Sequence, residues 1–338
     1  MNKKQKINPR SEIIGLLRGF FSLPVITTLN KLGIIDILLK NKAVSLNNFK
    51  NIKNKNFINS IFRYLESLGI LSINKNNKVY KVTILGEKIL KRVGSFHLLN
   101  SYSPFINNLD KFLINTNNKR ISCNRTENVI GSGLTNGRKF FPKALEFFKK
   151  DEFKIIADIG CGNGDYLGKC INYFDKSKYF ASDISTEAIY ETKKNLLNKY
   201  PLKKIKFLKS DAFDVKKWAK SLNTLLVSGD DKILISMWYI VHEISKNKKE
   251  RIVSFLKNIK KHCPNAEIII GEIIKIDNKI LSSNKDISIL PEFLFFHEIS
   301  NQGVLTIEDF KYIKKNMPYK LANIHNFDNV VHKNQKIP

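Results

Sequence analysis

The stretch KIIADIGCGNGDYL, residues 154–167, decides the fold. Its apolar run 155–159 predicts a buried strand that leads directly into glycines at positions 160, 162 and 164. Glycines at this spacing let the backbone turn tightly and approach a ligand without a Cβ clash. From residue 153 onward the pattern alternates strand and helix, which predicts a doubly wound parallel sheet.

Acidic residues follow the next two predicted strands. The segment KYFASDIS ends near Asp183, which is placed to accept both ribose hydroxyls, and IKFLKSDAF carries Asp211, where a carboxylate reads an adenine amino group. A dinucleotide site also predicts an acidic residue about 20 positions after the glycines, which Asp183 satisfies. The order of all the motifs, with Asp158 just before the turn in a D-x-G-x-G-x-G pattern, favours S-adenosylmethionine (SAM) over NAD.

The N-terminal third predicts a winged helix. Apolar residues recur at helical spacing through residues 11–40 and again over 56–68, and Ser45 is predicted to cap a short helix between them. ILSIN and KVYKVTI then alternate as strands around the turn 75–78. A winged helix can read DNA. Here, however, LGIIDIL, FRYLESLGIL and YKVTILGEKIL resemble the dimerisation domain of small-molecule O-methyltransferases.

Three segments are expected along the chain. Residues 1–95 form the winged-helix dimerisation domain, 96–150 form linking helices with a polar loop over 115–137, and 151–338 form the SAM-binding domain. A loop of that length inside a compact protein often covers a site. The fold class is therefore α/β, a Rossmann-like domain preceded by an α-helical winged-helix domain.

Two histidines lie where ligands are expected. His242 follows the predicted strand in KILISMWYIVHEIS, and the carboxyl ends of strands form the ligand edge of an open α/β sheet. A histidine there can act as general base toward a hydroxyl. His297 lies in LPEFLFFHEISNQG, on a helix expected to cover the substrate pocket. Two neutral imidazoles facing one pocket can hold Fe(II) or a similar ion, with positions left for substrate.

These features together resemble the class I SAM-dependent methyltransferases with a winged-helix dimerisation domain. GCGNGDYL, VHEIS and FFHEISNQ resemble the α-keto acid C-methyltransferases in particular, and RTENVIGSGLTNG resembles their linker loop more loosely. That resemblance implies glycines 160, 162 and 164 at the methionine part of SAM, Asp183 at the ribose and Asp211 near adenine. It also implies iron on His242 and His297, a chelating 2-oxo acid, and methylation of the β-carbon.

Other readings stay open at this point. An arginine is expected to pair with the substrate carboxylate, and Arg125 is the first candidate before Arg138. Glu243 and Glu298, one after each histidine, could serve as base, third ligand or partner for a basic substrate. The alternative function is a metal-independent O-methyltransferase with His242 as general base. Methylation of a macromolecule and a non-catalytic DNA-binding regulator are the remaining readings.

The amino-acid composition limits which partners are expected. The formal charge is +28, but the lysines run through every segment, with no basic tail or aromatic-interleaved stripe, which argues against a nucleic-acid partner. No apolar run long enough to span a bilayer and no signal-peptide pattern were found, so no membrane partner is expected. Four scattered cysteines favour a reduced cytoplasmic protein. A small-molecule substrate and a homodimer through the N-terminal domain are expected.

Overall fold

The structure is a computed structural model. It describes residues 9–74, 76, 78–114, 123–137, 140–150, 152–245, 248–277, 279, 281, 289–300 and 302–324. The chain divides into two compact units. The first comprises residues up to 107 together with 123–135, and the second comprises 108–122 and everything from 136 onward. Each unit is considered by itself.

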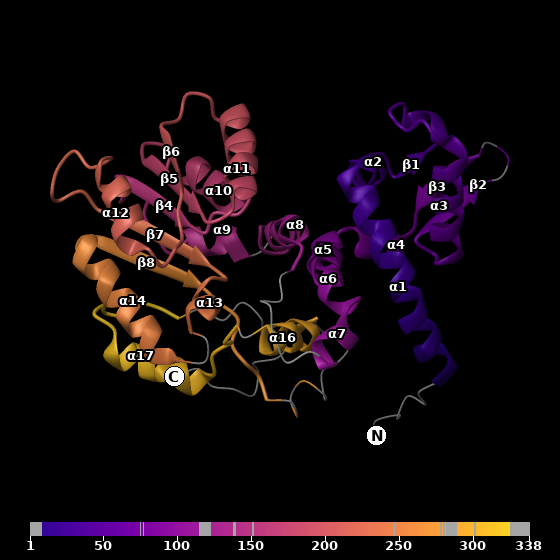
Figure 1. The fold of residues 1–338 in the computed structure, drawn as a ribbon. Helices are drawn as coiled ribbons and strands as arrows, with labels where there is room; N and C mark the ends of the chain where they lie inside the picture. The colour runs from indigo at the N-terminus through magenta and orange to yellow at the C-terminus, as the bar shows by residue number, and fades with distance from the viewer. Residues whose placement is uncertain are drawn as a thin grey trace, which may run out of the picture. The chain divides into compact units, whose positions relative to one another are not determined.

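The first unit contains helices around a small antiparallel sheet of strand order β1-β3-β2 (Figure 1). Its strands pair in register, with Ile73 opposite Tyr80. The elements are α1 (Pro9–Lys31), α2 (Ile34–Asn41), β1 (Ala43–Val44), η1 (Leu46–Asn48), α3 (Lys55–Ser67), β2 (Leu71–Asn74), β3 (Val79–Val82), α4 (Ile84–Leu90), α5 (Val93–Ser101), α6 (Ser103–Ile106) and α8 (Arg125–Asn136).

Local sequence explains the ends of these elements. Ser45 caps η1 as predicted, and Asn54 caps α3 by accepting the Phe57 N–H. Phe62 is fully buried between Phe49 and Tyr80, with ring centroids 5.4 and 5.1 Å away. The predicted helices and the two-stranded wing are confirmed.

Helix α1 contains an apolar stretch that the sequence analysis did not predict. Its residues Ile13–Lys31 are long and apolar enough to cross a bilayer by length and composition, with a mean hydropathy of 1.4. The prediction of no such run was therefore wrong, because Arg18 and Pro24 interrupt the apolar letters without lowering the average enough. The C-terminal part of the helix belongs to a domain core, since Ile26 and Leu29 are buried. A core helix passes the same test of length and composition.

The predicted loop over 115–137 is also corrected. Residues 125–136 form the helix α8, and residues 115–122 lie outside the described part of the chain. Asn124 stabilises the start of the helix by accepting the Glu127 N–H at 3.2 Å. Gly131 permits close packing on α5, because a Cβ there would lie 2.5 Å from the Leu98 nitrogen. The polar, glycine-containing sequence that suggested a loop instead forms a helix whose Gly131 allows close contact with α5.

The second unit is an α/β domain with a five-stranded sheet among the described residues. Its strand order is β6-β5-β4-β7-β8, and every neighbouring pair is parallel. The elements are α7 (Leu109–Ile114), α9 (Phe140–Leu145), β4 (Ile155–Ile159), α10 (Asp165–Tyr173), β5 (Lys178–Asp183), α11 (Thr186–Lys199), β6 (Ile205–Lys209), α12 (Val215–Asn223), β7 (Ile233–Trp238), α13 (Val241–Ser245), α14 (Lys249–His262), β8 (Ala266–Gly271), α16 (Leu290–Ile299) and α17 (Ile307–Asn316).

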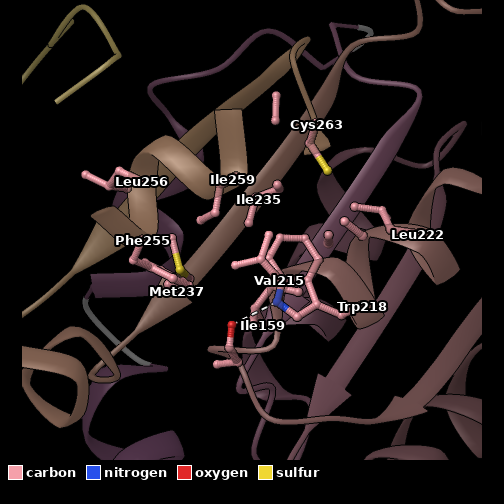
Figure 2. Packing of buried hydrophobic residues seen from close by; sticks show 14 of the residues in the cluster. Ile159, Val215, Trp218, Leu222, Ile235, Met237, Phe255, Leu256, Ile259 and Cys263 are labelled. Carbon is pink, nitrogen blue, oxygen red and sulfur yellow. Dashed lines mark hydrogen bonds between the residues drawn. The ribbon is translucent and has the colours of Figure 1, made fainter. Parts of the chain in front are cut away.

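Alternation along β4 separates two hydrophobic cores. Ile155, Ala157 and Ile159 contribute to the core beneath α12, α14 and α17, whereas Ile156 contributes to the core beneath α10 and α11. Figure 2 shows the first core, in which Trp218 lies among the aliphatic residues. Its Nε1–H donates to the Ala212 carbonyl at 2.8 Å, so the buried polar group is satisfied. Helices cover both faces of a parallel sheet, and the predicted fold class is confirmed.

Candidate functional site

The glycine turn lies between β4 and α10. Gly160, Gly162 and Gly164 have φ of 75°, 57° and 83°, in the left-handed region that favours glycine. Space is restricted as well, because a Cβ at Gly160 would lie 2.2 Å from the Ile240 Cδ1. The turn thus presents backbone at the start of a helix, where an anionic or polar ligand group can approach closely.

Asp183 ends β5 and is held by this turn. One carboxylate oxygen accepts the Gly162 N–H at 3.0 Å, and the other accepts the Ser185 N–H at 2.9 Å. A carboxylate can accept about four hydrogen bonds, so these two donors fix its orientation without exhausting its capacity. Asp183 therefore has the geometry of a rigid acceptor of ligand hydroxyls.

Asp158 and Asp211 differ in burial. Asp158 is buried within β4 and accepts a hydrogen bond of 2.9 Å from the Ser236 hydroxyl. The pKa of Asp158 is raised to about 7, mainly because the carboxyl is buried. The hydrogen bond from Ser236 lowers the pKa, and the nearby charge of Asp183 raises it. Asp211 is exposed two residues after β6, and its side chain accepts the Phe213 N–H at 2.9 Å. Both lie toward the carboxyl edge of the sheet, as does Asp183.

His242 lies in α13, just after β7, and is paired with a carboxylate that the sequence analysis missed. Its Nδ1–H donates to one oxygen of Glu272 at 2.9 Å, and its backbone N–H donates to the other at 3.1 Å. His242 and Glu272 are both almost fully buried. A carboxylate on Nδ1 fixes the ring orientation and tautomer, so Nε2 carries the lone pair.

Glu272 could have been found by the argument that identified His242. It directly follows β8, and β8 pairs with β7 in parallel, with Trp238 opposite Gly271. The carboxyl ends of neighbouring parallel strands meet at one edge, which brings residues 30 positions apart into contact.

His297 faces His242 from α16. The two ring centroids are 4.8 Å apart, with planes at 84°. The His297 Nδ1–H donates to the Phe293 carbonyl at 2.6 Å, and the Phe293 ring stacks on His297 with centroids 3.7 Å apart. Burial lowers the pKa of His297 to about 3, and neighbouring His242 lowers it as well. His297 is therefore a neutral imidazole at neutral pH.

Tyr239 lies between β7 and α13, close in sequence to His242. It has a φ of 56°, which is uncommon for a non-glycine residue, and it lies three positions before His242. Its backbone N–H donates to the Gly271 carbonyl at 2.8 Å, and its hydroxyl donates to the Asn136 side-chain oxygen at 2.9 Å. Burial, together with the nearby charge of Glu272, raises its pKa, so the hydroxyl keeps its proton.

Four other residues were predicted to take part in the site. Arg125 is exposed at the start of α8, in the first unit, and its role at the substrate carboxylate stays a prediction. Arg138 lies outside the described residues. The Glu298 side chain is 72% exposed and pairs with Lys275 at 3.8 Å. Glu243 is half-buried in α13, beside His242 in the sequence.

Within the described residues, no group of three or more His, Cys, Asp or Glu side chains has an arrangement that could hold a metal ion. The histidine pair can therefore supply two protein ligands, and a site built on it depends on substrate or water for the others. A histidine dyad of this kind can also act without metal, as an oriented base.

Known proteins resemble the chain in two separate segments. Residues 9–73 match a family model described as the AprA N-terminal domain, and residues 156–253 match one described as a methyltransferase domain. No curated protein matches the chain.

Several solved structures share the fold along nearly the whole chain. Human N-acetylserotonin methyltransferase in complex with SAM has a TM-score of 0.61 at 14% identity, with 96% of each chain covered. Mitomycin 7-O-methyltransferase has a TM-score of 0.54 at 12% identity, with 91% of each covered. A demethylriboflavin dimethyltransferase from Streptomyces davawensis has a TM-score of 0.53 at 14% identity, covering 95% of this chain and 96% of its own.

Such low identities establish the fold, whereas the methyltransferase-domain match covers the glycine turn and the strands that follow it. Nothing in these matches identifies an α-keto acid C-methyltransferase. The chain is an S-adenosylmethionine-dependent methyltransferase with a helical domain before its catalytic α/β domain.

Proposed function

We propose that the enzyme transfers the methyl group of SAM to the β-carbon of a small 2-oxo acid, assisted by a metal ion on His242 and His297. The observation that carries the proposal is the second imidazole: His297 is buried 4.8 Å from His242, centroid to centroid, and remains neutral. A general base for a hydroxyl needs one histidine, whereas a metal site of this type needs two.

The donor set fits such an ion. Metal-binding histidines usually donate their other ring N–H to a carboxylate or a backbone carbonyl, which orients the ring and raises its basicity. His242 does this toward Glu272 and His297 toward the Phe293 carbonyl. In both rings Nδ1 makes this bond, so Nε2 would be the nitrogen that coordinates the ion. Two imidazoles and no third protein ligand suit a bidentate substrate such as a 2-oxo acid.

Each residue then has a chemical task. The glycines at 160, 162 and 164 accommodate the methionine part of SAM beside Asp158, Asp183 accepts the ribose hydroxyls, and Asp211 lies near adenine. A bound divalent ion, with iron our first choice, would polarise the 2-oxo group as a Lewis acid. Glu272 and the Phe293 carbonyl fix the orientation of the two rings, and positioning of the acceptor carbon near the sulfonium methyl supplies further rate enhancement.

A second candidate, O-methylation of a hydroxylated small molecule without metal, is favoured by the His242–Glu272 pair itself. A histidine whose Nδ1–H is held by a carboxylate is a well-oriented base, and its Nε2 could take a hydroxyl proton. One structural neighbour is a 7-O-methyltransferase, and another is a dimethyltransferase of an amino-demethylriboflavin. These neighbours fit this candidate as well as the first.

Metal content separates the two candidates. Freshly purified wild type, His297→Ala and the control His262→Ala, whose histidine ends α14 away from the pair, are compared by elemental analysis. We expect about one metal ion per chain in wild type and control and none in His297→Ala. Activity on a panel of 2-oxo acids should follow the metal. Absence of metal from all three, with chelator-resistant methylation of hydroxyl groups, would leave the O-methyltransferase.

Dimerisation through the N-terminal domain is part of the proposal. The first half of α1 exposes apolar side chains that water does not favour: Ile13, Leu16, Leu17, Phe20 and Phe21 are 57–80% exposed. A second copy of the chain would cover them. We expect Leu16→Lys combined with Phe20→Lys to yield monomers in sedimentation analysis. Leu202→Lys, at a 98% exposed site in the second unit, should leave the dimer intact.

A further inference from the structure

The positive charge of the second unit is uneven between the two helix layers of its sheet. Helices α12, α14 and α17 cover one face, and α14 packs against both of the others (Figure 1). Together they carry eleven Lys and Arg residues against three acidic ones. Helices α10 and α11, on the other face, carry four against three. Between these two layers, the excess of basic residues therefore lies on the one formed by α12, α14 and α17.

The lysines of this layer form two stripes. Lys216, Lys217 and Lys220 are exposed on α12, and Lys257, Lys260 and Lys261 are exposed on α14. Spacings of three and four residues put members of each stripe on one helix face, where like charges repel one another. In the part of the chain that the structure describes, no salt bridge involves any of these six side chains. An anionic partner would relieve this repulsion.

The residue types on this layer indicate which class of anionic partner it could bind. Among the described large apolar side chains, only Tyr312 of these three helices is exposed, at 36%, so the layer has little to insert into a bilayer. Tyr312 is the one exposed aromatic residue among the described residues of these helices, and Lys249 lies 5.0 Å from its ring centroid, so the layer offers no row of rings on which successive bases could stack. Arg251 is the sole arginine of the three helices, whereas nucleic-acid sites favour the arginine fork. A second copy that presents the same layer is disfavoured, because the two basic surfaces would repel each other.

We infer that the outer face of the α12–α14–α17 layer is a docking surface for an acidic protein surface. Point charges on lysines suit a transient, electrostatically steered complex that forms quickly and weakens with salt. The surface is built from the outward sides of the helices, away from the core that they share with β4 and β7. Free small substrates would reach the enzyme without it.

The test compares two triple variants of the full chain that have equal net charge. Lys220→Glu, Lys257→Glu and Lys261→Glu reverse the proposed surface, while Lys193→Glu, Lys194→Glu and Lys199→Glu reverse α11. Affinity for poly-L-glutamate, RNA duplex and anionic vesicles is measured over a range of salt, with thermal melting to verify folding. We expect the first variant to lose poly-L-glutamate affinity by roughly tenfold or more and the second by less than about threefold.

Two outcomes would overturn the inference. Equal weakening by both variants, or no poly-L-glutamate binding by wild type, would mean that the layer is not a specific surface. Stronger site-dependent binding of RNA or vesicles than of poly-L-glutamate would replace the acidic protein with another class of partner. Methylation of a free small acceptor should be the same in both variants and serves as the folding control at the active site.

Discussion

Two regions of the molecule bury histidines, and they use them differently. In the first unit, His97 is fully buried, with Nδ1 2.6 Å from a Glu127 oxygen and Nε2 2.8 Å from the Asn30 side-chain oxygen. Lys31 contacts the other Glu127 oxygen. In the second unit, His297 uses Nδ1 for the Phe293 carbonyl, and within the described residues no hydrogen bond is formed to its Nε2.

Burial therefore does not distinguish a structural histidine from a chemical one. His97, His242 and His297 are exposed by only 0%, 4% and 5%. The distinction lies in the partners of the rings. His97 contacts Glu127 and Asn30 and so links α1, α5 and α8, whereas His242 and His297 face each other and are oriented through Nδ1. The comparison predicts that variants of the two regions will fail in different measurements.

The largest effect is expected for His242→Ala. Loss of the base or metal ligand should lower kcat/KM by about 10²–10⁴-fold, because either role acts directly on the reacting groups. The melting temperature should also fall, because Glu272 loses its buried partner, so activity is compared per folded molecule. Steady-state kinetics on the best acceptor, paired with calorimetry, checks both. Turnover within a few-fold of wild type would remove His242 from the chemistry.

His97→Ala should lower stability without lowering activity. Removing one member of a buried carboxylate–imidazole pair leaves Glu127 without that partner and opens a cavity, which costs about 3 kcal/mol or more in free energy of unfolding. Activity per folded molecule should be unchanged. Denaturant titration measures the loss, and retention of wild-type stability would show that Lys31 and Asn100 alone satisfy Glu127.

Glu272→Gln should fall between these two. An amide can still hold the His242 ring, but it does not stabilise positive character on it, so a 10–100-fold loss in kcat or metal affinity is expected. The pH profile of kcat should shift in the same variant. A stability defect with normal kinetics would instead assign Glu272 the kind of role that Glu127 has.

The smallest effect is an acid dependence of the first unit. Burial raises the pKa of Glu127, but hydrogen bonds from Lys31, His97 and Asn100 lower it more, leaving it below the ordinary value of 4.5. A lowered folded-state pKa contributes stability that is present above the unfolded pKa and is lost as pH falls through the folded pKa. The free energy of unfolding of wild type should therefore decrease as the pH is lowered below 4.5. Glu127→Gln should show a weaker dependence on pH in this range.

The sequence predicted what depends on local pattern. The glycine turn, the acidic residues after successive strands and the wing each follow from spacing within short segments, and the structure has the predicted sheet and wing. His242 was found because its position at the end of a strand is visible in the letters. Glu272 was missed although it has the same position, since its importance appears only when β8 is placed beside β7.

Other features could not be predicted because they depend on packing. The segment ENVIGSGLTNG has the composition of a loop, yet it forms most of α8, where Gly131 lies against α5. Where positive charge accumulates depends on which side of each helix its exposed lysines lie. The net charge of +28 does not show this. The left-handed φ of Tyr239 likewise belongs to the turn between β7 and α13 and not to any rule for tyrosine.

Because each of the two units is formed from separate segments of the chain, the division determines what proteolysis or truncation can produce. The backbone leaves the first unit after Asn107, returns to it by Cys123 to form α8, and leaves again at Asn136. No single cleavage can then yield both units whole. A protease that nicks between residues 107 and 123 should leave two fragments that stay associated, because α8 remains held to α5 by the Gly94–Gly131 contact and the His97–Glu127 bond. Expression of residues 136–338 alone would omit α7, which belongs to the second unit. A truncated chain that preserves both units must therefore keep residues 108–135 in place.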